Sequence, residues 1–108
     1  MAAKSIPDEV RALVQEIVDR FNRKRLGRSR IRYGPRFQGK YLYLDRDDFG
    51  TVGPICRLTY TGDMSAWEFA IFKYSSERYD PEEWMFPGAE HVDGTVEGAL
   101  EAGMEAYP

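Results

Sequence analysis

The single cysteine and the single histidine are the residues of this chain whose chemistry is easiest to recognise. A thiol and an imidazole can form a nucleophile–base pair, which makes Cys56 and His91 a candidate pair. Cys56 stands in an apolar, strand-like stretch, however, where a lone cysteine is usually a small core residue. His91 stands in a loop rich in glycine and proline, a context that favours a surface position. The sequence therefore predicts no catalytic residue, and an enzyme is not the first interpretation.

Metal and cofactor motifs are not evident in the sequence. One cysteine and one histidine exclude cysteine-rich zinc sites and two-histidine motifs. Neither a phosphate-binding loop nor a dinucleotide fingerprint occurs. The stretch Asp45–Gly50 resembles the start of an EF-hand loop, but Cys56 occupies the position of the final glutamate. The sequence thus predicts no cofactor, no bound metal, and a solvated acidic turn over this stretch.

The strongest chemical pattern combines arginines with tyrosines. Nine basic and no acidic residues lie between Arg20 and Lys40. Strand alternation predicts that one sheet face carries Arg30, Arg32, Arg36, Tyr41 and Tyr43. Arginines bind phosphates and tyrosines stack on bases, so this face is a candidate platform for single-stranded nucleic acid. The alternative is that the arginine stems simply cover the tyrosine rings on a solvated face.

Charge is distributed unevenly along the chain. Residues 1–40 hold 11 Lys/Arg and 4 Asp/Glu, whereas residues 41–108 hold 4 Lys/Arg and 14 Asp/Glu. Such asymmetry can indicate an anionic partner, or the two halves can neutralise each other in the fold. Because the whole chain carries a net charge of −3, mutual neutralisation is the favoured interpretation.

The segment Tyr79–Gly88 concentrates three aromatic residues and two prolines in ten positions. Such a segment can line a ligand pocket or a protein-binding groove. The candidate pocket residues are Tyr79, Trp84 and His91. The alternative is an ordered loop that closes the end of the core.

The elements that position these residues follow from hydrophobic periodicity. A helix is predicted to begin near Ser5 and Pro7 and to end at Gly27, because apolar residues recur at helical spacing from Val10 to Phe21. Strands are then predicted at residues 30–33, 41–44, 54–60 and 67–74. Gln38-Gly39 is the expected hairpin turn, and a bulge at Gly34-Pro35 would reverse the faces upstream of it.

The remaining chain predicts two helices. Asp80 is expected to begin a short helix that Pro87-Gly88 stops, and Asp93 is expected to cap a closing helix that runs through Met104. The sequence thus predicts one α+β domain over residues 1–108: an N-terminal helix, a four-stranded antiparallel meander, and a short and a C-terminal helix, packed on one sheet face. The expected core comprises Val14, Ile17, Val18, Phe21, Ile31, Leu42, Leu44, Leu58, Trp67, Phe69, Ile71 and Leu100.

The C-terminal third, over Tyr74–Asp80, Trp84, Pro87-Gly88 and Asp93–Leu100, resembles a small family of uncharacterised prokaryotic proteins. Its members are short stand-alone chains with a helix, a sheet and a closing helix. The family has no assigned activity. The resemblance therefore implies a single domain and transfers no site residues.

Composition sets the expected functional class. No apolar run approaches the 20 or so residues of a membrane span and no secretory signal is visible, so we expect a cytoplasmic location. The first interpretation is a non-enzymatic binding or interaction domain. The aromatic content of 14% suggests a protein partner or a homodimer. The alternatives are a nucleic-acid-binding module that uses the basic segment Arg20–Lys40, and a small-ligand binder or enzyme with a pocket near Trp84 and His91.

Overall fold

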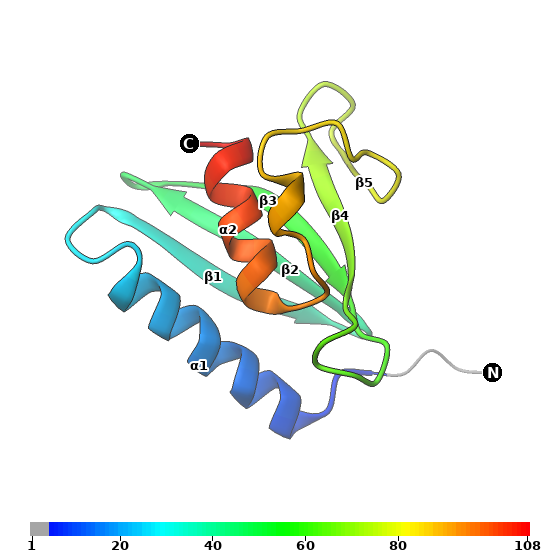
Figure 1. Cartoon of the computed structure of the whole chain (residues 1–108). Helices are drawn as coiled ribbons and strands as arrows, with labels where there is room; N and C mark the ends of the chain where they lie inside the picture. Colours follow the sequence, from blue (N-terminus) through cyan, green and yellow to red (C-terminus); the bar gives the residue numbers. More distant parts are fainter. Residues whose placement is uncertain (1–4) are drawn as a thin grey trace.

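The computed structural model describes residues 5–108, and it has the α+β architecture that the sequence predicts (Figure 1). The elements are, in chain order, α1 (Asp8–Lys24), β1 (Ile31–Gln38), β2 (Tyr41–Asp48), β3 (Thr51–Thr59), β4 (Glu68–Lys73), β5 (Arg78–Asp80), the 3-10 turn η1 (Ala89–His91) and α2 (Val96–Ala106). None of the helices in these residues is long and apolar enough to cross a membrane.

The five strands form one antiparallel meander in the order β1-β2-β3-β4-β5. The count exceeds the prediction by one, because β5 pairs with β4 through only three residues, Arg78–Asp80. A strand this short has too few positions to show alternation in the sequence. The predicted faces are correct: Tyr33, Leu42 and Leu44 are all buried on the inner side.

Both long helices pack on the same side of the sheet (Figure 1). The core between the two layers contains all twelve residues that the sequence predicts, with Ile17 and Ile31 partly buried at its edge. Among residues 5–108, no helix covers the opposite face of the sheet.

The N-terminal helix forms as its periodicity predicts. Its buried residues, Val10, Val14, Val18 and Phe21, recur every three or four positions. The N-cap is Pro7 rather than Ser5, and no side chain caps the helix. Gly27 follows with a φ of +39°, a left-handed conformation suited to glycine.

The first hairpin turns at Gly39-Lys40, one residue later than predicted, and Gln38 pairs with Tyr41. The later turn changes the register by two residues, which leaves every side chain on its predicted face. Pairing is continuous through Gly34 and Pro35, so β1 has no bulge there. The irregularity of the sheet lies instead opposite Leu44 and Asp45, and it leaves the adjacent Ile55 and Cys56 of β3 both buried.

The predicted short helix between Asp80 and Pro87 is wrong, because these residues form turns and no helix. Asp80 ends β5 and its carboxylate accepts a hydrogen bond from the Glu82 amide, which forms a turn rather than a helix start. The 3-10 turn η1 begins only after Gly88, whose φ is +98°. The N-cap of α2 is Thr95 rather than Asp93, and the Thr95 hydroxyl accepts from the Gly98 amide at 3.0 Å. The Asp93 carboxylate accepts hydrogen bonds from the amide and the hydroxyl of Thr95.

Candidate functional site

The uncovered sheet face carries a group of large side chains that we call the aromatic face. Alternation along β2 points Tyr41 and Tyr43 outward, because Leu42 and Leu44 point into the core. Strand pairing places Arg36 and Arg57 on either side of Tyr43. The aromatic face comprises Arg36, Tyr41, Tyr43, Arg57, Phe72 and Tyr79.

The rings of the aromatic face form a continuous series. Ring centroids lie 6.1 Å apart for Tyr41 and Tyr43, 5.3 Å for Tyr43 and Tyr79, and 5.0 Å for Phe72 and Tyr79. Ala70 pairs with Arg57 beneath this layer and is only 3% exposed. A small residue at that position leaves room for the larger side chains to lean across it. The series thus extends from β2 to β5, over strands that are not neighbours in the sheet.

Cationic side chains lie against these rings. The guanidinium carbon of Arg36 lies 4.4 Å from the Tyr43 ring centroid. That of Arg57 lies 4.7 Å from the Tyr41 ring and 5.5 Å from the Tyr79 ring. These distances are within the range of cation–π attraction, which orients each guanidinium.

The two arginines of the aromatic face differ in their charge partners. Arg36 donates to Asp45 at 3.0 Å, and this hydrogen bond raises the pKa of its guanidinium. Arg57 has no ion pair with any of residues 5–108, and its buried Nε has no hydrogen-bond acceptor. A buried donor without an acceptor is costly, and this guanidinium makes no hydrogen bond to residues 5–108 that would offset its charge. An anionic group would meet the guanidinium through its terminal nitrogens rather than through the buried Nε.

A hollow of about 230 Å³ adjoins Arg57 on this face. It is lined by Lys40, Tyr41, Arg57, Thr59, Glu68, Phe69, Ala70 and Pro81. Its polar lining offers two cations and two hydroxyl groups against a single carboxylate. The Lys40 ammonium also lies 5.4 Å from the Tyr41 ring centroid. We call this site the Arg57 hollow, and its lining suits an anionic group attached to a flat ring.

The predicted nucleic-acid residues are brought together only in part. Arg36, Tyr41 and Tyr43 lie side by side on the aromatic face. Arg30 is exposed just before β1, and Arg32 points outward but donates to the carbonyls of the preceding loop. Arg57 and Tyr79 belong to the face although the sequence did not assign them to it. The alternation of β3 could have indicated Arg57, whereas Tyr79 needed the unpredicted strand β5.

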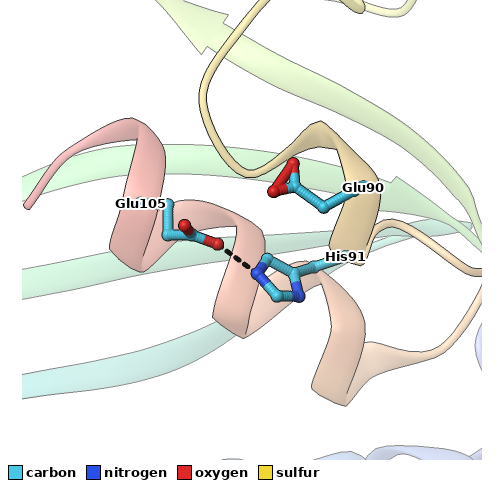
Figure 2. A group of neighbouring side chains, drawn as sticks. All are labelled: Glu90, His91 and Glu105. Carbon is cyan, nitrogen blue, oxygen red and sulfur yellow. Dashed lines mark ion pairs between the residues drawn. The ribbon is translucent and has the colours of Figure 1, made fainter.

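The predicted pocket residues lie in three different places. Tyr79 belongs to the aromatic face. Trp84 is 49% exposed and lines a separate hollow of about 480 Å³ with Trp67 and Phe69. His91 lies on η1 beside Glu105 of α2, as Figure 2 shows. Neither Tyr79 nor His91 lines the Trp84 hollow.

Cys56 is fully buried in β3, as the core interpretation of this residue predicts. Burial raises the pKa of its thiol, which keeps the sulfur protonated. A reactive cysteine needs the opposite environment, with exposure and nearby positive charge. The thiol is therefore a packing group.

Comparison with known proteins identifies no family for this chain. No protein-family model matches the chain, and no curated protein or solved structure does either. The resemblance to the small prokaryotic family stays a prediction, and the functional argument rests on the residues of the site itself.

Proposed function

We propose that this protein is a binding module that holds single-stranded nucleic acid against its aromatic face. The observation that carries the proposal is the Arg57 guanidinium, which lies against the Tyr41 and Tyr79 rings and has no ion pair among residues 5–108. A phosphate would provide the missing charge partner, and the exposed parts of the rings would provide stacking surfaces.

The binding mode follows from the arrangement of cations and rings. A phosphate in the Arg57 hollow would contact Arg57 and Lys40, while its base stacks on the neighbouring Tyr41 ring. The next base would reach Tyr43, whose ring centroid lies 6.1 Å from that of Tyr41. Stacking and phosphate contacts do not read base edges, so we expect little sequence preference.

A second candidate function is self-association through the same face. The uncovered sheet presents partly exposed aromatic rings over several strands, and such surfaces commonly contact a partner protein. In a homodimer the rings would be covered by a second copy of the chain, and Arg57 would need a carboxylate from that copy.

The first experiment measures the binding of a labelled single-stranded oligonucleotide by fluorescence anisotropy at two salt concentrations, about 50 and 200 mM. We expect micromolar binding that weakens steeply with salt. Arg57→Gln should lower the affinity and reduce the salt slope by about 1, because one phosphate contact is lost. Tyr41→Ala should lower the affinity by about fivefold or more, since stacking contributes roughly 1–3 kcal/mol per base.

Arg23→Gln is the matched control, because Arg23 is an exposed arginine of α1, on the helical layer of the molecule. An equal loss of affinity in Arg23→Gln and Arg57→Gln would contradict a defined site on the aromatic face. Absence of binding at the lower salt concentration would overturn the proposal. A dimer by light scattering that Tyr43→Ala dissociates would favour self-association instead.

A further inference from the structure

A second group of chemically active side chains lies on the helical layer and shares no residue with the aromatic face. Glu90 and His91 belong to η1 and Glu105 belongs to α2 (Figure 2). The His91 Nε2 and a Glu105 carboxylate oxygen form a close ion pair. One ligand atom from each of the three residues lies within 4.8 Å of the other two.

Close backbone packing holds the two elements together. A Cβ at Gly98 would clash with the carbonyl oxygen of His91, and a Cβ at Gly88 would lie 2.6 Å from that of Ala102. Gly98, Ala102 and Glu105 are spaced by four and three residues, so they form one stripe along α2. The two small residues let η1 approach this stripe, and Glu105 lies at its end beside His91.

The charge of the cluster is unbalanced. Among residues 5–108, the His91–Glu105 contact is the only ion pair that any of the three residues makes. The Glu90 carboxylate is exposed and has no cationic partner there. Two carboxylates beside one imidazole therefore leave a net negative site that faces solvent, which attracts a cation.

The donor set points to the kind of cation. Imidazole nitrogen binds first-row transition metals, and one nitrogen with two carboxylate oxygens suits Zn²⁺ better than Mg²⁺ or Ca²⁺, which take oxygen ligands alone. Ligands of a tetrahedral zinc lie roughly 3.4 Å apart, given bonds of about 2.0–2.1 Å. Rotation of the exposed Glu90 and Glu105 side chains about their own bonds can close the 4.8 Å cluster to that spacing.

We propose that Glu90, His91 and Glu105 form a binding site for one divalent transition-metal cation, with Zn²⁺ as the best match. The cation binds between the imidazole nitrogen and the carboxylate oxygens of the two glutamates. Water completes the coordination. The sequence showed no such site, because Glu105 stands 14 residues after His91 and only the packing of η1 on α2 brings them together.

The bound metal would connect η1 to α2 and stabilise their contact. We therefore expect Zn²⁺ to raise the melting temperature of the full chain, because a cation that binds only the folded state stabilises that state. Isothermal titration calorimetry should give one Zn²⁺ per chain. His91→Ala and Glu105→Gln should each weaken binding about tenfold or more.

Glu97→Gln is the matched control, because Glu97 is an exposed glutamate of the same helix that lines a hollow against α1. Its zinc affinity should equal that of the parent chain. Glu90→Gln tests the site without breaking an ion pair among residues 5–108, and it should also weaken binding. Circular dichroism of each variant checks that it is folded.

His91 is the sole histidine, so its ring resonances in a proton–carbon NMR spectrum report on the site without ambiguity. We expect these resonances to shift when ZnCl₂ is added and to remain unchanged with MgCl₂. Unchanged ring resonances at saturating Zn²⁺ would overturn the proposal. Equal zinc affinity in the parent chain and in a folded His91→Ala or Glu90→Gln variant would overturn it as well.

Discussion

At the scale of single residues, Arg46 shows how a buried charge is used in the fold. Its side chain is only 2% exposed on the inner face of β2. The guanidinium donates two hydrogen bonds to the Asp48 carboxylate, at 2.7 and 3.0 Å. It also donates to the carbonyls of Gly103 and Tyr107 at the end of α2. The Gly103 carbonyl also accepts from the Tyr107 N–H, whereas the Tyr107 carbonyl lies past the last hydrogen bond of the helix. Arg46 therefore supplies a donor at this end of α2 and complements the helix dipole.

We expect Arg46→Met to destabilise the fold by about 2–3 kcal/mol, because the carboxylate and two carbonyls lose their shared donor. Urea unfolding at neutral pH measures this change. Arg36→Met is the control, since the Arg36–Asp45 ion pair is exposed and contributes about 1 kcal/mol at most. Equal losses in the two variants would show that Arg46 contributes no more than a surface charge.

At the scale of elements, the contact of α2 with the sheet depends on Gly103. A Cβ at this position would clash with the Tyr33 hydroxyl and lie 2.5 Å from Ile55 Cγ2. The Tyr33 hydroxyl donates to the Leu100 carbonyl at 2.8 Å, and burial raises the pKa of this tyrosine above its usual value. The helix thus packs directly on β1 and β3, with a tyrosine hydroxyl between them.

We expect Gly103→Ala to lower stability by about 1–3 kcal/mol through overpacking. An exposed helix position would instead gain about 1 kcal/mol from the same change, so the sign of the effect tests the contact. Thermal unfolding measures it. Adding Tyr33→Phe removes one of the two clashes and should make Gly103→Ala less costly. A higher melting temperature for Gly103→Ala alone would contradict the packing described here.

The loop after β5 depends on a second charge pair. The Lys73 ammonium donates to Glu83 at 2.9 Å and also lies 3.8 Å from Asp80. The hydrogen bond from Lys73 holds the pKa of Glu83 below its ordinary value. A carboxyl group with a lowered pKa in the folded state stabilises the fold above its ordinary pKa, and this contribution is lost as the pH falls.

We expect Glu83→Gln to be less stable than the parent chain at pH 7. The difference should be smaller at about pH 3, which lies below the ordinary pKa of a glutamate carboxyl group, because part of the parent chain is then protonated at Glu83. Urea unfolding at the two pH values tests this expectation. Glu82→Gln, an exposed neighbour without an ion pair among residues 5–108, should show no such pH-dependent difference. A constant difference for Glu83→Gln at both pH values would contradict the charge mechanism.

At the scale of the whole molecule, the fold brings part of the basic half against part of the acidic half. Arg25 follows α1 and pairs with Glu101 of α2 at 2.8 Å. Arg20 and Lys24 line the same hollow as Glu97 and Glu101. This contact between α1 and α2 fits the interpretation that the charges of the two halves of the chain neutralise each other. Arg36 and Lys40, by contrast, lie toward the aromatic face.

We expect Glu101→Lys to destabilise the fold by up to about 1 kcal/mol, because it places a cation among Arg20, Lys24 and Arg25. About 1 M NaCl should remove most of the loss, since the screening length then falls to about 3 Å. Urea unfolding at low and high salt measures both effects. Glu82→Lys is the control and should cause no loss. A loss that persists in high salt would indicate packing rather than charge.

The sequence predicted most of the fold because most of its signals are local. Apolar spacing from Val10 to Phe21 indicates a helix wherever that segment packs. Alternation in β2 separates the outward Tyr41 and Tyr43 from the buried Leu42 and Leu44. The hairpin turn lies one residue later than predicted, which changes the strand register by two residues and leaves each side chain on its predicted face. The short strand β5 was missed because three residues carry no periodicity.

The sequence by itself determined the two long helices, the presence of the four longer strands and the direction in which their side chains point, because these follow from contacts between residues a few positions apart. It predicted a solvated turn from Asp45 onward, whereas Asp45–Asp48 extend β2. Only the tertiary structure decided which distant residues meet. Arg57 reaches Tyr79 through the strand pairing of β3, β4 and β5. His91 reaches Glu105 through the packing of η1 on α2. Both candidate sites depend on such long-range contacts. Local alternation predicted only Arg36, Tyr41 and Tyr43 of the aromatic face, because the other residues become neighbours only when the strands pair and the layers pack.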